Sequence, residues 1–191
     1  MKKLGFLMLT LAIAAMLGGT ALAQNPITED SPYFTTYYSN ANTTGAPDET
    51  VRIINGGATG GNLYADIYVF DDSEELQECC SCQVTPDGLL SESVNKNLTA
   101  NPITGIKPTR GVIKVIASPN NDATAIGTLS TGLTGWSTHV QKLSSGFLLT
   151  EASMHPMSLS ADEFSLLQSL CLFDKRLSGQ PCTCTPEDSD F

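Results

Sequence analysis

The sequence is poor in basic residues, histidine and aromatic side chains. Its 191 residues include 10 Lys and Arg against 20 Asp and Glu, which gives a formal net charge of −10 at pH 7. It has two His and one Trp, and aromatic residues make up 7% of the chain. An acidic surface repels phosphate groups, so this balance argues against binding to nucleic acid or to anionic lipid. With 41% hydrophobic residues, however, the chain is too apolar to be disordered.

Long hydrophobic runs are also scarce, and the first one is typical of an export signal. Two lysines precede an apolar stretch, Leu4 to Leu17, which is shorter than the ~20 residues that a membrane-spanning helix needs. Residues 21–23 then read Ala-Leu-Ala, the small-x-small pattern of a signal peptidase site. We therefore predict a cleaved signal peptide over residues 1–23 and no membrane insertion after cleavage. The expected location is periplasmic or extracellular.

The rest of the chain divides into three parts by composition. Residues 24–49 are rich in Asn, Thr, Ser and Pro and have no sustained hydrophobic period. We interpret them as a polar N-terminal arm, either extended with its aromatic residues docked on the domain or flexible. Residues 50–185 have the patterns of a single folded domain, and residues 186–191 form an acidic tail.

The domain is predicted to be mainly β. Residues 62–70 alternate with a period of two, which places Leu63, Ala65, Ile67 and Val69 on one face, in a core. Turn residues recur about every ten residues between short apolar runs, a pattern typical of an antiparallel β-sandwich of immunoglobulin-like architecture. No βαβ pattern occurs, which argues against the nucleotide-binding folds. The other expected strands cover 51–54, 80–84, 89–94, 111–117, 125–129, 136–142 and 146–152.

One α-helix is predicted near the C-terminus. A capping box begins at Ser160, and Phe164, Leu167 and Cys171 recur at helical spacing. The helix should span about residues 161–176 and cover one end or edge of the sandwich.

Six cysteines form two dense groups and one single residue. All of them follow the predicted signal peptide, and an exported chain meets oxidising conditions that favour disulfides. An even number agrees with complete pairing, although six cysteines permit fifteen connectivities. The predicted disulfide cysteines are Cys79, Cys80, Cys82, Cys171, Cys182 and Cys184.

Strand geometry favours pairing between the two groups over pairing within them. Adjacent residues of a strand point to opposite faces. Residues two apart are roughly 6.6 Å apart, at the outer limit of disulfide geometry. The simplest arrangement therefore places Cys182-Thr183-Cys184 beside Cys80-Ser81-Cys82 and joins Cys79 to Cys171. The sequence leaves the other connectivities open.

These features favour an exported, non-enzymatic structural, adhesive or binding module whose ligand is unknown. We predict no cofactor and no catalytic residues. A cell-surface or extracellular protein is one possible partner. A carbohydrate is another, bound on a surface formed by Trp136 with Tyr64 and Tyr68.

Two other functions remain as alternatives. The first is a thiolate-rich protein that binds zinc or copper, although neither cysteine group has a flanking His. The second is an exported hydrolase using Ser153, His155 and Asp162, for which the sequence has no supporting motif. The metal ligands of the first alternative would be Cys79, Cys80, Cys82, Cys182 and Cys184.

Overall fold

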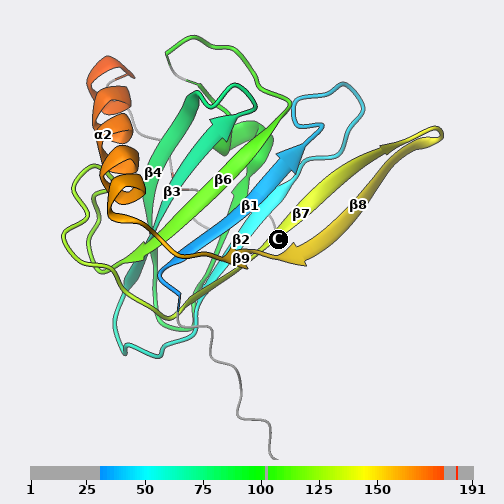
Figure 1. Cartoon of the computed structure of the whole chain (residues 1–191). Coiled ribbons are helices and arrows are strands. Elements are labelled where there is room, and N and C mark those ends of the chain that lie inside the picture. The colour runs from blue at the N-terminus through cyan, green and yellow to red at the C-terminus, as the bar shows by residue number, and fades with distance from the viewer. Residues whose placement is uncertain (1–30, 102, 179–183, 185–191) are drawn as a thin grey trace, which may run out of the picture.

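The computed structural model describes residues 31–101, 103–178 and 184, and its fold is mainly β with one C-terminal α-helix. This confirms the predicted fold class (Figure 1). The predicted signal peptide and the acidic tail lie outside the described residues. Among the residues that are described, no helix has the length and apolar composition needed to cross a membrane.

Two antiparallel sheets face each other in a sandwich-like arrangement. The five-stranded sheet has the order β4-β3-β6-β1-β9, and the four-stranded sheet has the order β5-β2-β7-β8. A π-helical turn, η2 (Val94–Leu98), follows β5. The strands are β1 (Tyr33–Ser39), β2 (Thr50–Asn55), β3 (Leu63–Asp71), β4 (Leu76–Val84), β5 (Leu89–Ser93), β6 (Arg110–Ser118), β7 (Leu133–Leu143), β8 (Gly146–Ser153) and β9 (His155–Pro156).

The core between the sheets follows the predicted alternation. Leu63, Ala65, Ile67 and Val69 of β3 are buried there, together with residues of β2 and β6. Their β-branched and apolar side chains suit a pleated surface that is covered on one side. The prediction for this strand is therefore confirmed for one of its two faces.

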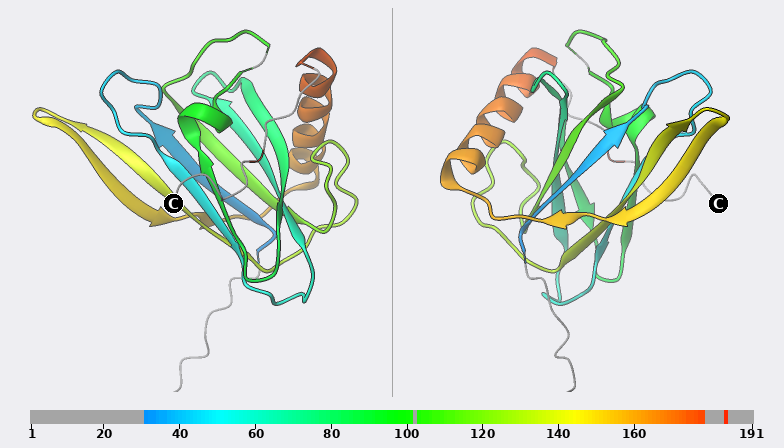
Figure 2. Two further views of the ribbon diagram at one scale, coloured as in Figure 1. Left: turned by 180° about the vertical axis from the view of Figure 1, so that it is seen from behind. Right: turned by 45° about the vertical axis from the view of Figure 1, so that its right-hand side comes forward.

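The other face of β3 is buried as well, which the alternation did not predict. The helix α2 (Ala161–Ser178) lies along the outside of the five-stranded sheet (Figures 1 and 2). Tyr68 on β3 packs there with Leu167 and Cys171 of α2. The sheet is thus covered on both faces, by the second sheet and by α2.

The predicted N-terminal arm is wrong for residues 33–39, which form β1 within the five-stranded sheet. β1 pairs with β6 along its whole length, from Tyr33 opposite Ile116 to Ser39 opposite Arg110. Tyr38 is 1% exposed, and its hydroxyl donates to the Phe70 carbonyl oxygen at 3.1 Å. Aromatic and β-branched residues favour strands. Their polar groups, however, hide the hydrophobic period from a sequence pattern.

A second correction concerns residues 125–129, which form a loop and not a strand. Ala123 and Ile126 are buried against the face that α2 covers. The Tyr68 hydroxyl donates to the Ala123 carbonyl oxygen at 2.6 Å, which fixes the loop over the sheet. Of the apolar residues in the predicted strand, Ile126 is buried by this loop, whereas Ala125 and Leu129 are exposed.

Candidate functional site

The first disulfide joins the sheet to the helix. Cys79 on β4 and Cys171 on α2 are bonded, with an S–S distance of 2.08 Å across 92 residues of sequence. Both side chains are buried. The pairing predicted for Cys171 is thus present in the structure.

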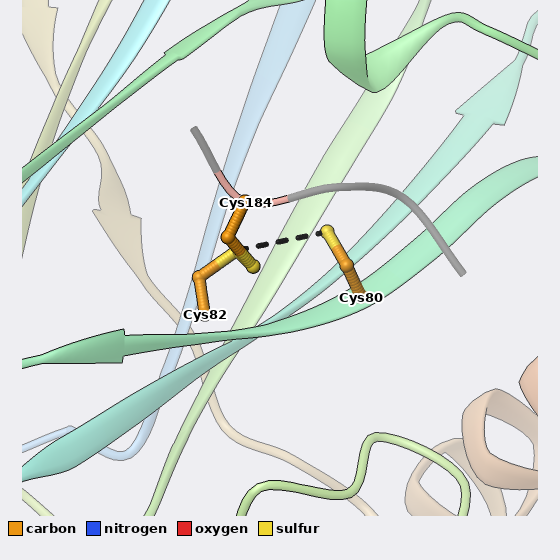
Figure 3. A group of neighbouring side chains, drawn as sticks. All are labelled: Cys80, Cys82 and Cys184. Carbon is orange, nitrogen blue, oxygen red and sulfur yellow. Dashed lines mark hydrogen bonds between the residues drawn. A yellow bond between two sulfur atoms is a disulfide. The ribbon is translucent and has the colours of Figure 1, made fainter. Parts of the chain in front are cut away.

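The second disulfide joins the opposite face of β4 to Cys184. Cys82 is bonded to Cys184 at an S–S distance of 2.09 Å (Figure 3), and Cys80 is also disulfide-bonded. Cys182, which we predicted in this group, lies outside the described residues. Disulfides of this kind persist in oxidising environments, which indicates a compartment other than the cytoplasm.

The five cysteines predicted as metal ligands do not form one cluster. Cys79 faces α2, whereas Cys80 and Cys82 face the space between the sheets, because neighbouring residues of β4 alternate. The sulfur atoms of Cys80, Cys82 and Cys184 lie within 4.8 Å of one another. In the structure these sulfurs are in disulfides and not thiolates, so they offer no thiolate ligand in this oxidation state.

A buried acid lies beside this sulfur group. The Glu92 carboxyl oxygen Oε1 is 4.0 Å from the Cys82 sulfur, and the Asn97 side-chain amide donates to Oε2 at 2.6 Å. Glu92 is 1% exposed. The contact with Asn97 holds the carboxyl group toward the sulfurs.

A small cavity of about 90 Å³ lies beside the Cys79–Cys171 disulfide. Its lining includes Ser81, Asp122, Thr124 and Lys175. Pockets that hold organic ligands measure roughly 300–1,000 Å³, so this cavity suits only water or a small ion.

Two buried acids flank the same face of the sheet. Asp174 on α2 lies with Oδ2 3.8 Å from the Cys79 sulfur, and burial raises the pKa of its carboxyl group. Asp66 on β3 is 0% exposed, and burial, with the nearby Asp122 charge, raises its pKa to about 7. Neither acid lines the cavity, which argues against a catalytic role.

Another buried acid, Glu49, connects the two sheets. Glu49 accepts hydrogen bonds from the Ser39 backbone N–H at 3.1 Å and the Val140 backbone N–H at 2.6 Å. Ser39 ends β1 and Val140 belongs to β7, so one carboxyl group joins both sheets. Burial raises the pKa of Glu49 to about 7, although both N–H donors act to lower it.

The structure also brings together a Ser and a His that sequence reasoning missed. Ser137 Oγ lies 3.2 Å from His139 Nε2, and burial lowers the pKa of the imidazole. The two residues are alternate positions of β7, a spacing that appears often by chance. Ser137 is 2% exposed and accepts or donates a bond with Thr36 Oγ1 at 2.6 Å. A substrate carbonyl has no access to it, so we interpret the pair as structural.

The predicted hydrolase residues are not hydrogen-bonded to one another in the described part of the chain. Ser153, His155 and Asp162 are all exposed, and none of the hydrogen bonds in the described part of the chain links them. A catalytic triad needs such bonds between nucleophile, base and acid. The arrangement therefore gives no support to this alternative.

The predicted aromatic carbohydrate surface is not formed either. Tyr68 is fully buried beneath the loop at Ala123. Trp136 lies on β7 in the four-stranded sheet, whereas Tyr64 and Tyr68 lie on β3 in the five-stranded sheet. These rings share no surface.

The most exposed apolar feature of the sheets is the end of the β7–β8 hairpin. The hairpin projects from the body of the molecule, as all three views show (Figures 1 and 2). Leu143, Leu148 and Leu149 are 48%, 46% and 48% exposed. β8 pairs with β7 on one side, and no described strand pairs with its other edge. We call residues 141–153 the β7–β8 arm.

Comparisons with known proteins leave the family open. No family model matches the chain, and no curated protein is similar to it. Two solved structures resemble it weakly. The crystal structure of Thermotoga maritima 1070 has a TM-score of 0.44 and 10% identity, and the match covers 69% of this chain and 99% of that one. The Anabaena sensory rhodopsin transducer has a TM-score of 0.34 and 12% identity, covering 62% and 94%. At these TM-scores neither likeness supports an argument about function.

Proposed function

We propose that the chain is an exported, non-enzymatic structural module that associates with a second copy of itself through the outer edge of β8. The observation that carries the proposal is the β7–β8 arm, with its exposed leucines and an outer edge that no described strand pairs with. The export signal predicted over residues 1–23 and the disulfides support a location outside the cytoplasm.

The edge of β8 lacks the features that keep natural edge strands from pairing. Such strands usually carry Lys, Pro, a bulge or an inward-pointing charge. β8 has no Lys and no Pro, and its pairing with β7 is regular over all eight residues. Its one charged residue, Glu151, contacts Arg52 of β2 at 3.7 Å, on the side of the sheet away from the outer edge.

The charge of the β7–β8 arm is compatible with a second copy at this place. The chain has a net charge of −10, so two copies repel each other. The β7–β8 arm holds one Lys and one Glu, Lys142 and Glu151, and is therefore neutral. Contact between two arms adds no further repulsion.

Antiparallel pairing of β8 with the β8 of a second copy would form a closed, two-fold symmetric dimer. The same patch would contact the same patch about a two-fold axis, which gives a dimer and not a filament. The four-stranded sheet would continue through the pair as one sheet of eight strands, twice the four of a single chain. Leu148 and Leu149 would then be partly covered by the partner strand.

Sedimentation velocity of the mature chain, residues 24–191, tests the proposal. The wild type should dimerise with rising concentration, whereas Leu148→Lys/Leu149→Lys should stay monomeric because charges on an edge strand block pairing. The matched control is Leu166→Lys/Phe173→Lys, which changes two apolar residues on α2 that are more exposed than those of the arm and should dimerise like the wild type. A wild type that is monomeric at all soluble concentrations would overturn the proposal, as would an arm variant that still dimerises.

A further inference from the structure

Three sulfur atoms converge on the inner face of β4. Cys80 and Cys82 are alternate residues of the strand and point the same way, and Cys184 lies over them (Figure 3). Their sulfurs lie within 4.8 Å of one another, and those of Cys80 and Cys82 are 3.9 Å apart. Zn–S bonds of about 2.3 Å in a tetrahedral site place two sulfurs about 3.8 Å apart. The spacing of Cys80 and Cys82 is thus close to what a metal ion would require, whereas the bonded sulfurs of Cys82 and Cys184, 2.09 Å apart, would have to separate on reduction.

The surroundings of these sulfurs also suit a soft cation. Cys80 and Cys82 are 2% and 0% exposed and belong to the core between the sheets. The Glu92 carboxyl group, 4.0 Å from the Cys82 sulfur, offers an oxygen donor at the same place. Thiolates bind Cu⁺ and Zn²⁺ in preference to Ca²⁺ or Mg²⁺.

We infer that Cys80, Cys82 and Cys184 form a redox-gated site for one thiophilic cation, Cu⁺ or Zn²⁺. The oxidised chain holds these sulfurs in disulfides and does not bind the ion. The reduced chain binds it through three thiolates, with Glu92 as the fourth ligand of Zn²⁺. The site is independent of the β7–β8 arm and does not rest on the proposed dimer.

Each disulfide of the site is reduced by two successive thiol–disulfide exchanges. A dithiol reductant attacks the Cys82–Cys184 bond, and one cysteine leaves with a proton while a mixed disulfide forms on the other. The second thiol of the reductant releases that cysteine, so the reductant ends as a disulfide and two protons end on Cys82 and Cys184. A second equivalent of the dithiol opens the disulfide of Cys80 in the same way and leaves a proton on each of its two sulfurs. The cation then displaces the protons of the three thiols it binds.

Metal retention after reduction tests the inference. The mature chain is reduced with a dithiol, freed of it by anaerobic gel filtration, loaded with Cu⁺ or Zn²⁺ and filtered again before elemental analysis. The wild type should retain one ion per chain, and the oxidised chain should retain none. Cys82→Ser/Cys184→Ser should lose retention. The matched control, Cys79→Ser/Cys171→Ser, removes the disulfide between β4 and α2 and should retain the ion.

Alkylation of the wild type gives a second readout that does not depend on how a variant folds. Compared with the reduced chain without metal, the loaded chain should show less alkylation of Cys80, Cys82 and Cys184, whereas the alkylation of Cys79 and Cys171 should be the same with and without metal. Glu92→Gln should weaken retention of Zn²⁺ about tenfold or more and leave Cu⁺ retention unchanged. Equal labelling of all five cysteines with and without metal would overturn the inference. Metal retention by the oxidised chain, or an equal loss of retention in the two double cysteine variants, would do the same.

Discussion

At the scale of single residues, the buried carboxyl groups are an unusual feature of this fold. Glu49 directly precedes β2 and lies beside the last residue of β1 and the part of β7 beyond its pairing with β2. It supplies an acceptor to one backbone N–H from each strand. A buried N–H without an acceptor costs about 1–3 kcal/mol. One side chain therefore supports the joint between the sheets.

Glu49→Ala should destabilise the domain by about 2–4 kcal/mol, since it leaves the Ser39 and Val140 N–H groups without this acceptor. Urea unfolding followed by circular dichroism measures the change. Glu151→Ala is the control, because its carboxyl group is exposed and its ion pair with Arg52 is long; it should cost less than about 1 kcal/mol. Equal midpoints for the two variants would show that Glu49 does not join the sheets.

Asp66 should make stability fall as pH rises. Burial raises its folded pKa to about 7, above the unfolded value of about 3.9. The folded state therefore binds the proton more tightly, so this contribution is complete below about pH 4 and is lost as pH rises through 7. Asp66→Asn removes the charge, and at pH 8 it should raise Tm by about 2–4 °C. Thermal melts at pH 5 and pH 8 test this; an Asn variant with the same pH slope as the wild type would contradict it.

At the scale of elements, β1 contributes a full strand to the core. Tyr38 and Tyr37 are neighbours with opposite environments, at 1% and 49% exposure. Tyr38→Ala should cost about 3–5 kcal/mol through the lost packing. Tyr37→Ala, the matched control, should cost about 1 kcal/mol or less. Guanidinium chloride unfolding of the two variants gives the comparison, and equal losses would place β1 outside the core.

The helix α2 depends on its covalent link to β4. Cys171→Ala removes a disulfide that closes a loop of 92 residues, and we expect a loss of about 2–5 kcal/mol. Leu172→Ala changes the next residue, which is 37% exposed and lies outside the disulfide, and it should cost about 1 kcal/mol or less. Thermal unfolding under non-reducing conditions compares them. A Cys171 variant as stable as the Leu172 variant would mean that packing alone holds the helix.

At the scale of the whole molecule, the acidic charge opposes the association that the β7–β8 arm favours. Salt screens repulsion between the copies, because the Debye length falls from about 10 Å at 0.1 M to about 3 Å at 1 M salt. The proposed dimer should therefore tighten as NaCl is added. Sedimentation equilibrium at low and high salt measures the change. A dimer that weakens with salt would indicate an interface made of ion pairs, which the neutral arm does not provide.

The sequence alone determined the most regular elements and favoured one arrangement of the disulfides without excluding the others. The alternation at residues 63–69 and the helical spacing around Leu167 survive in the structure, because each pattern reflects a face that must be buried whatever the partner is. Local geometry separated Cys79 from Cys80, since neighbouring cysteines of a strand point to opposite faces; its pairing with Cys171 was the simplest arrangement, and the structure contains it.

Tertiary structure decided what covers those faces and what remains uncovered. β1 has no hydrophobic period in its sequence, and its burial comes from β6 beside it and from the second sheet. Its polar groups find partners, such as the Phe70 carbonyl oxygen, only after folding. Glu49, Ser137 and His139 likewise have contacts with strands that are distant in the sequence: Glu49 with β7, and Ser137 and His139 with β1. The β7–β8 arm has an ordinary strand sequence. Its exposure follows from its place at the edge of the four-stranded sheet, where no described strand covers it, and strand order is set by long-range contacts that a local pattern does not contain.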